Sequence, residues 1–186
     1  MAENRELPAG RVEVRVGHTA QLEAVELAGA RALLYRVFDD MAEEDWEHSL
    51  GGMHALVREG GVVVAHASVV QRRMVHRGRA WRVGYVEGVS VEERLRRRGY
   101  GAAVMAALEE VIARGYDFGA LAATDEAMDF YASRGWQRWL GPTSALTPAG
   151  IVRTEDADDC LFVLPGSTPL DRKGELTCDW RDGDVW

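Results

Sequence analysis

The chain has 186 residues, of which 47% are hydrophobic, so we expect one domain spanning 1–186 around a single core. Its formal net charge of -8 argues against nucleic acid as the main partner, because phosphates would be repelled, and favours a cationic small molecule. The longest apolar stretch, 62–70, is too short to cross a bilayer, so no membrane partner is expected.

Cysteine and histidine usage points to a reducing compartment and no metal. Cys160 and Cys178 have neither the C-x-x-C spacing nor a zinc spacing, so free thiols are favoured over a disulfide. The five histidines do not show the spacing of metal ligands. The first residues lack a hydrophobic signal region. We therefore expect a cytoplasmic protein without a metal.

The first 50 residues predict a strand and two helices. Hydrophobic and charged residues alternate over 12–16, which is typical of a strand with one wet face. Thr19 is suited to cap a helix over about 20–38, in which Gly29 is unfavourable. The residues expected to face inward on this helix are Leu22, Val25, Ala32, Leu33 and Val37. A short helix over 43–50 follows.

The middle of the chain predicts antiparallel strands. Glu59-Gly60-Gly61 separates two extended patterns, 54–58 and 62–70, as in a β-hairpin. Arg77-Gly78-Arg79 then turns the chain into a long strand, 81–91.

The second half predicts two helices and several short strands. The helices are expected over about 99–114 and 125–134, and the strands over 119–123, 136–140, 144–146 and 161–164. The final stretch, 178–186, shows no regular pattern. This order predicts an α/β fold of the mixed α+β kind, a twisted mixed sheet with flanking helices.

Residues 96–102, Arg-Arg-Arg-Gly-Tyr-Gly-Ala, which we call the arginine turn, join the long strand to a helix. Glycines let the backbone approach a ligand closely, and free N–H groups at a helix start can hold a pyrophosphate. The P-loop order is missing, and Val104 stands where a dinucleotide fingerprint has its third glycine. The residues expected to bind phosphates are Arg96, Arg97, Arg98, Gly99, Gly101 and Ala102. The alternative is a basic helix start on a surface turn.

Glu87 is the one acid in an apolar strand. On ideal alternation it shares a face with Val83, Tyr85, Val89 and Val91. A carboxylate among apolar groups has a raised pKa, which suits a general base near neutral pH. Gly88 indicates a bulge or a close ligand approach. The alternative is an acid on an edge strand facing water.

Tyr131, near the end of the helix expected over 125–134, is a second candidate for a functional residue. Gly135 can stop this helix in a left-handed conformation. Phe130 is then the expected core residue, and Tyr131 projects toward a ligand cleft. The alternative for Tyr131 is a packed tyrosine with one hydrogen bond.

Two acidic segments, one over 39–45 and one over 179–186, are further candidates for a binding site. Such runs are usually solvated surface. Val185 and Trp186 are too apolar for a typical frayed tail, so the C-terminus can fold back and bring a carboxylate to a cation site.

Two motifs stand in order along the chain: Arg96-x-x-Gly99-x-Gly101, and Phe130-Tyr131-x-x-x-Gly135-Trp136. Together they resemble the acyl-CoA signature and the later tyrosine motif of the GNAT acyltransferase superfamily. Segments that closely resemble the aminoglycoside 2′-N-acetyltransferases are 45–56, 84–89, 131–136, 141–144 and 178–186. The resemblance covers nearly the whole chain from about Val12, and the closing segment is the most specific.

The resemblance implies a GNAT-like sheet, acetyl-CoA as donor, an aminoglycoside 2′-amine as acceptor, antibiotic resistance and a homodimer. It implies that Glu87 is the general base through water, that Tyr131 is the general acid, and that Val89 and Val91 pair with the pantetheine arm. The residues that it implies for antibiotic contact are Asp40, Asp45, the Gly88 carbonyl, Asp184 and the Trp186 carboxylate.

Two positions depart from the resemblance. Family members can carry a serine at Ala122 and an acid at Ala157, so the affinity for the antibiotic and its spectrum stay open. Three alternative functions also stay open. The chain could acetylate a different amine, such as a cell-wall amino sugar or a polyamine, it could acetylate protein lysines, or it could be a silent module that binds CoA or an antibiotic.

Overall fold

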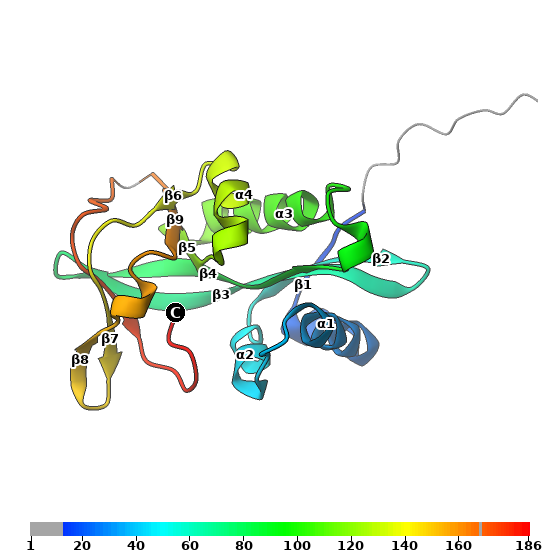
Figure 1. Ribbon diagram of the computed structural model, residues 1–186, viewed down its shortest axis with the longest axis horizontal. Coiled ribbons are helices and arrows are strands. Elements are labelled where there is room, and N and C mark those ends of the chain that lie inside the picture. Colours follow the sequence, from blue (N-terminus) through cyan, green and yellow to red (C-terminus); the bar gives the residue numbers. More distant parts are fainter. Residues whose placement is uncertain (1–12, 168) are drawn as a thin grey trace, which may run out of the picture.

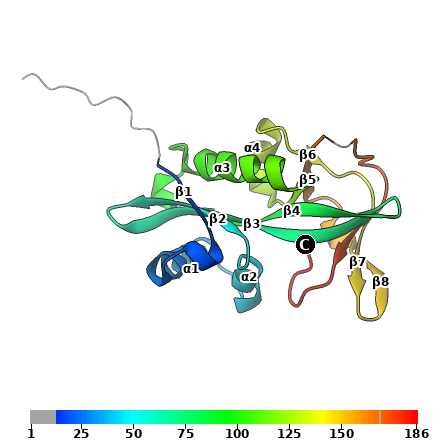
Figure 2. The same cartoon turned by 180° about the vertical axis from the view of Figure 1, so that it is seen from behind.

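A computed structural model describes residues 13–167 and 169–186. A twisted sheet separates two layers of helices (Figure 1). One face of the sheet carries α3 (Tyr100–Gly115) and α4 (Met128–Ser133), and the other carries α1 (Ala24–Val37) and α2 (Glu43–His48). The view from behind shows the same layering (Figure 2). The helices thus leave both ends of the sheet's central strands open to loops and to the C-terminal tail.

The sheet is mixed, as predicted. Its strands are β1 (Arg15–His18), β2 (Met53–Glu59), β3 (Val62–His76), β4 (Arg79–Val91), β5 (Phe118–Ala122), β6 (Gln137–Arg138), β7 (Thr143–Thr147), β8 (Gly150–Arg153), β9 (Leu161–Leu164) and β10 (Leu176–Asp179). Their order is β6-β9-β5-β4-β3-β10-β7-β8, and β2 pairs with β3 and β1 off this path. The pairs β4–β5 and β10–β7 are parallel, and the others are antiparallel. The predicted fold class is confirmed.

The main core lies between α3 and the sheet. The stripe predicted from the helical period is buried there through Val104, Leu108 and Ile112, and Met105 joins it. A second buried cluster lies near the C-terminus, where Trp139, Phe118 and Trp186 pack together with the ends of several strands. The tail is therefore part of the core and not an appendage.

The N-terminal predictions need correction. The strand covers Arg15–His18 and not 12–16, and residue 12 lies outside the described residues. Thr19 does not cap α1, because its hydroxyl accepts a hydrogen bond from the Gly51 N–H (2.9 Å) and meets His54. Helix α1 instead begins at Ala24, after the N-cap residue Glu23.

The later start of α1 changes which residues face the core. Val25 is 67% exposed and Ala32 is also exposed, so both were wrongly predicted to face inward, whereas Leu22 and Leu33 are buried. Packing explains why a glycine stands at position 29, inside the helix. A Cβ there would lie 2.9 Å from Val63 Cγ2, so glycine lets α1 approach β3 closely.

Both hairpins of the middle region are confirmed. β3 runs on to His76, six residues beyond the predicted end, because its polar second half pairs with β4 on one edge and with β10 on the other. The predicted helix over 125–134 is divided into a 3-10 turn, Asp125–Ala127, and α4.

The sequence missed two strands, β8 and β10. Each has four residues, too short for a readable alternation, and each exists through pairing with β7. The expectation of an irregular 178–186 is wrong for its first two residues, which belong to β10. Both cysteines are free, with Cys178 buried and Cys160 partly buried. In the described part of the chain, no helix is long and apolar enough to cross a membrane.

Candidate active site

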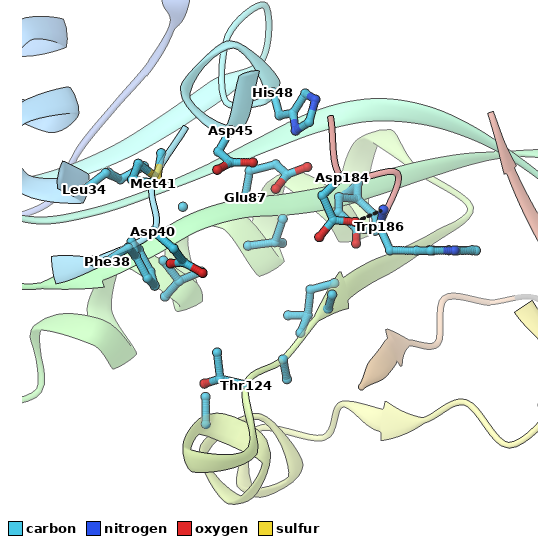
Figure 3. A pocket seen from close by; sticks show the side chains of 18 of the residues that line it. Leu34, Phe38, Asp40, Met41, Asp45, His48, Glu87, Thr124, Asp184 and Trp186 are labelled. Atoms are coloured by element: carbon cyan, nitrogen blue, oxygen red, sulfur yellow. Dashed lines mark hydrogen bonds between the residues drawn. The ribbon is translucent and has the colours of Figure 1, made fainter. Parts of the chain in front are cut away.

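A cavity of about 360 Å³ opens where the α1–α2 loop, the middle of β4, the end of β5 and the C-terminal tail meet (Figure 3). The residues with ionisable side chains that line it include Asp40, Asp45, His48, Glu87, Arg181 and Asp184. Leu34, Phe38 and Met41 form an apolar wall on one side. We call this hollow the acidic cavity. It brings together eight of the site residues expected from the sequence: Asp40, Asp45, Glu87, Gly88, Val89, Tyr131, Asp184 and Trp186.

A bulge in β4 forms the floor of this cavity. Ser68 of β3 faces Glu87, but His66, two residues earlier, faces Ser90, so β4 holds one extra residue at this point. Gly88 has φ +57, and a Cβ there would lie 2.8 Å from Leu34 Cδ2. Glycine is therefore required for both conformation and space. The bulge places Glu87, Gly88 and Val89 along the cavity, next to Tyr85 and Val86 from the regular part of β4.

β4 is not an edge strand, because it lies between β3 and β5, and the Glu87 side chain is largely buried, so the alternative of an edge-strand acid facing water is wrong. Its side chain is 15% exposed and forms an ion pair with Arg181. Burial raises the pKa of Glu87 above the usual range, and the positive charge and hydrogen bond of Arg181 oppose that rise. A raised carboxyl pKa is what the predicted general base needs.

The C-terminal tail folds back onto the sheet, as its apolar residues predicted. Arg72 of β3 is 4% exposed and clamps the tail, donating to Asp179 Oδ1 (2.8 Å) and to the Val185 carbonyl (2.7 Å). Trp186 is 6% exposed, and its indole N–H donates to Thr154 Oγ1 (2.8 Å). The end of the chain is thus held at the rim of the acidic cavity.

Two arginines of this arrangement were missed by sequence reasoning. Arg181 donates to the Asp184 carbonyl (2.7 Å) and to Glu87, and its guanidinium lies 5.5 Å from the Tyr85 ring centre. The guanidinium of Arg72 lies 4.9 Å from the same ring. The available signals were that Arg72 alternates with Val70 and Met74 on one face of β3, and that Arg181 is an arginine inside the acidic tail.

Three carboxylates of the cavity lack a cationic partner within the described residues. Asp40 is exposed on the α1–α2 loop. Asp45 Oδ2 accepts from the Ala42 N–H (2.9 Å), and Asp184 Oδ1 accepts from the Trp186 N–H (3.1 Å). Figure 3 shows them on two sides of Glu87. The cavity therefore carries excess negative charge, which suits a ligand with several positive charges. The described residues hold no group of three His, Cys, Asp or Glu side chains able to bind a metal ion.

Tyr131 is packed in the core and also lines the acidic cavity. It is 5% exposed, and it packs at 5.2 Å between ring centres against Phe130. Burial raises its pKa, so the phenol keeps its proton across the physiological range. Phe130 is only partly buried, so the sequence assigned the deeper position to the wrong member of the pair. Gly135, with φ +90, follows the end of α4 as predicted.

Beyond Tyr85, β4 and β5 separate. These parallel strands pair only over Val83–Tyr85 and Phe118–Ala120. Val89 and Val91 follow on β4, past the paired section. A splayed pair of parallel strands leaves backbone groups of β4 available to an extended ligand.

The arginine turn lies beyond the end of β4 and does not line the acidic cavity. Gly99 has φ +86, and no side chain caps α3. Arg96, Arg97 and Arg98 are exposed, and none of them forms an ion pair among the described residues. A Cβ on Gly101 would make only ordinary contacts, 3.5 Å from Val91 and 3.7 Å from Phe130. Since protein packing does not require this glycine, close approach of a ligand to the helix start is the remaining reason for it.

The two departures from the family resemblance share one hollow. A second cavity of about 570 Å³ adjoins the first and has Ala122, Asp184 and Trp186 in common with it. Ala157, which is 6% exposed, also lines this second cavity, together with Glu155 and Asp156. Substitution of either alanine by a larger side chain would narrow it.

Comparison with known proteins agrees with this geometry. The family model described as Acetyltransferase (GNAT) domain matches residues 19–139. An aminoglycoside 2′-N-acetyltransferase from Mycolicibacterium fortuitum is 50% identical over 177 residues, which cover 92% of this chain and 91% of that protein.

Solved structures share the fold at low identity. The GNAT family N-acetyltransferase YhbS from Escherichia coli, in complex with CoA, has a TM-score of 0.62 at 15% identity, covering 96% of this chain and 94% of that chain. Escherichia coli ElaA has a TM-score of 0.57 at 19% identity, covering 83% of this chain and 99% of that chain.

Proposed function

The chain belongs to the aminoglycoside 2′-N-acetyltransferases of the GNAT acetyltransferase family, and from that premise we propose that it moves the acetyl group of acetyl-CoA to the 2′-amine of an aminoglycoside. The observation that carries the proposal is the acidic cavity, in which three carboxylates surround the buried Glu87 and have no cationic partner among residues 13–167 and 169–186. Aminoglycosides carry several ammonium groups, so the cavity and the antibiotic are complementary in charge.

Binding of the donor is supported by the other end of β4. The pyrophosphate of acetyl-CoA would accept hydrogen bonds from the uncapped start of α3, and Arg96, Arg97 and Arg98 would supply charge for its phosphates. The pantetheine arm would run along the open edge of β4 at Val89 and Val91. This path leads the thioester toward the acidic cavity, because Val89 lines that cavity.

The acceptor amine is protonated at pH 7 and attacks only after it loses a proton. Glu87 would take that proton, directly or through one water. The raised pKa of Glu87 makes it a stronger base than an ordinary carboxylate, while Arg181 keeps it ionised. Asp40, Asp45 and Asp184, with the Gly88 carbonyl and the Trp186 carboxylate, would hold the remaining positive charges.

Transfer then proceeds by direct attack, without a covalent enzyme intermediate. The amine nitrogen bonds to the thioester carbon, and the backbone near Val89 would stabilise the oxyanion. The C–S bond breaks, the nitrogen loses its second proton, and the thiolate takes a proton from Tyr131, which later regains one from solvent. One proton is released overall for each ammonium converted to an amide.

The regiospecificity of the product tests this function. We expect aminoglycosides with a 2′-amine to be acetylated at that nitrogen, and 2′-hydroxy analogues to remain unmodified at that position, because Glu87 then has no ammonium to deprotonate. Mass spectrometry and NMR of the product give the site. Acetylation at the 3- or 6′-amine, with the 2′-amine untouched, contradicts the proposal.

A thiol-release assay with several amines separates the alternatives. Amino sugars, polyamines and lysine peptides should release CoA far more slowly than a 2′-amino aminoglycoside at equal concentration. Binding of both ligands without any release would instead indicate a silent binding module. Expression in a susceptible bacterium should raise the inhibitory concentration of 2′-amino aminoglycosides only, which is the expected resistance phenotype.

We further propose a cytoplasmic homodimer. An apolar surface on the β7–β8 hairpin supports the dimer: Leu146, Ile151 and Val152 are 50%, 64% and 48% exposed. Sedimentation of the full chain should give twice the monomer mass, and Ile151→Asp should give the monomer. An unchanged monomeric mass for the unmodified chain contradicts the dimer.

A further inference from the structure

Two buried histidines connect the surface loop at Thr19 to the bulge of β4. Thr19 Oγ1 lies 2.8 Å from His54 Nε2, His54 Nδ1 lies 3.0 Å from His66 Nε2, and His66 Nδ1 lies 2.9 Å from the Gly88 oxygen. Both imidazoles are fully buried. The chain of bonds ends on the residue that makes the floor of the acidic cavity, yet neither histidine lines that cavity.

The Gly88 carbonyl, at the end of this series of hydrogen bonds, determines which atom is the donor and which the acceptor in the bonds of the two histidines. A carbonyl oxygen only accepts, so His66 carries its proton on Nδ1 and leaves Nε2 as an acceptor. His54 must then donate from Nδ1, and its own Nε2 accepts from the Thr19 hydroxyl. The Thr19 oxygen in turn accepts from the Gly51 N–H. With both rings neutral, this is the one tautomer pattern that pairs His54, His66 and the Gly88 carbonyl, and the Thr19 hydroxyl has the Gly52 carbonyl (3.3 Å) as a second acceptor.

This pattern requires both rings to be neutral. Burial lowers the pKa of His54 to about 4 and that of His66 to about 3, so each ring has a single N–H at pH 7. A second proton on His66 would face the Nδ1–H of His54 and break the chain.

We propose that His54 and His66 are positioning residues of the acceptor site, which hold the Gly88 carbonyl and thereby fix the bulge that presents Glu87 and Val89 to the acidic cavity. The inference rests on the proposed function for its kinetic consequence, but not for its geometry. Gly88 has a left-handed φ and no side chain of its own, so a hydrogen bond to its carbonyl fixes the orientation of the adjoining peptide. The carbonyl keeps a second lone pair for the substrate.

The same geometry excludes a proton relay from Glu87. The chain ends on a carbonyl oxygen and contains no contact between either imidazole and the Glu87 carboxylate. It therefore transmits orientation and not protons.

His76 provides a matched control on the same strand. Like His66 it is buried, and its Nδ1 lies 2.8 Å from a backbone carbonyl, that of Glu175, away from the acidic cavity. His66→Phe and His76→Phe each remove one bond to a backbone carbonyl at similar volume, and His66→Phe also removes the bond to His54. We expect both variants to lower the melting temperature, but only His66→Phe to lower kcat by about tenfold or more, with acetyl-CoA affinity unchanged.

A third variant separates positioning from packing. In His66→Asn the amide nitrogen can take the place of Nδ1 and donate to Gly88, so kcat should recover relative to His66→Phe even though the cavity left by the ring lowers stability. Equal kcat losses in His66→Phe and His76→Phe, or no loss in a folded His66→Phe, would overturn the proposal.

A spectroscopic test needs no activity. Nitrogen NMR of the imidazoles in the full chain at pH 7 should show protonated Nδ1 and unprotonated Nε2 for both histidines, and addition of a 2′-amino aminoglycoside should shift the Nδ1–H signal of His66. An Nε2–H tautomer at His66 would overturn the inference while leaving the proposed function intact. Failure of the unmodified chain to acetylate any aminoglycoside would count against the function and leave the tautomer result standing.

Discussion

The acidic cavity lies at the middle of β4 and the arginine turn follows the end of the same strand, but the residues of the two regions come together differently. The arginine turn is one continuous run of seven residues at the start of a helix. The cavity joins the α1–α2 loop, the β4 bulge and the C-terminal tail, and its ion pair between Arg181 and Glu87 links residues 94 positions apart. One region is basic and local, whereas the other is acidic and depends on the whole fold.

This difference predicts that substitutions in the two regions impair different steps of the reaction. A change in the arginine turn should weaken donor binding and leave acceptor chemistry alone, because none of its residues lines the cavity. A change in the cavity should affect the antibiotic or the proton transfer and spare the donor. Each prediction below tests that independence.

The largest effect is expected for Glu87→Gln. The amide keeps the shape but cannot accept a proton, so kcat near pH 7 should fall by about 100-fold or more. Calorimetry should show acetyl-CoA affinity little changed. Asp182→Asn is the control, because it removes the same charge from a tail residue that does not line the cavity. An unchanged pH–rate profile for Glu87→Gln would assign the base to another acid.

A neutral extension beyond Trp186 should have the next largest effect. The buried indole and the bond from its backbone N–H to Asp184 hold the terminal carboxylate at the cavity. Charge-assisted hydrogen bonds of this kind contribute about 1.5–3 kcal/mol, so KM for the antibiotic should rise by about tenfold or more.

The same extension placed before Met1 is the control for that experiment. Steady-state kinetics should show acetyl-CoA KM unchanged in both proteins. Equal antibiotic KM values for the two tagged enzymes would mean that the end of the tail does not contact the substrate.

Gly101→Ala is the matching change in the arginine turn. The added methyl makes only ordinary protein contacts and suits a helix, so the melting temperature should stay level or rise slightly. Because the methyl stands where a ligand backbone approach is expected, the Kd for acetyl-CoA should increase by about fivefold. The antibiotic KM should not move. A stable variant with unchanged acetyl-CoA affinity would place the phosphates elsewhere.

The smallest effect concerns Arg181→Gln and depends on pH. The reaction needs the Glu87 carboxylate, so activity is lost as pH falls through its raised pKa. Arg181 lowers that pKa, with help from His48 and Arg72, while Asp40, Asp45 and Asp184 line the same cavity. Its removal should move the acid limb of kcat/KM to higher pH, costing about threefold at pH 6 and little at pH 8.

Arg181→Lys retains the positive charge and should move the limb less than Arg181→Gln. A limb that moves to lower pH in the glutamine variant would contradict the assignment of Glu87 as the titrating base.

Local sequence determined the parts of this protein that are made by neighbouring residues. The arginine turn, the apolar stripe of α3 and the β2–β3 hairpin depend on backbone preferences and on spacing within a few residues, which a linear pattern shows directly. The sequence also indicated Glu87, as an acid in an apolar strand, and the bulge, through Gly88. Both patterns lie within one strand. The apolar end of the tail likewise predicted its docking.

Tertiary structure alone decided what those residues face. The clamp from Arg72 to Asp179 spans 107 positions, and β10 exists only because it fits between β3 and β7. Thr19 is engaged by the Gly51 N–H, and α1 instead starts after Glu23, whose N–H donates to Glu26 Oε2 (3.0 Å). The hydrogen bonds that link Thr19, His54, His66 and Gly88 could not be predicted from the sequence for the same physical reason. Hydrogen bonds and ion pairs form between groups that folding brings within about 3 Å, and their spacing along the chain carries no periodic signal.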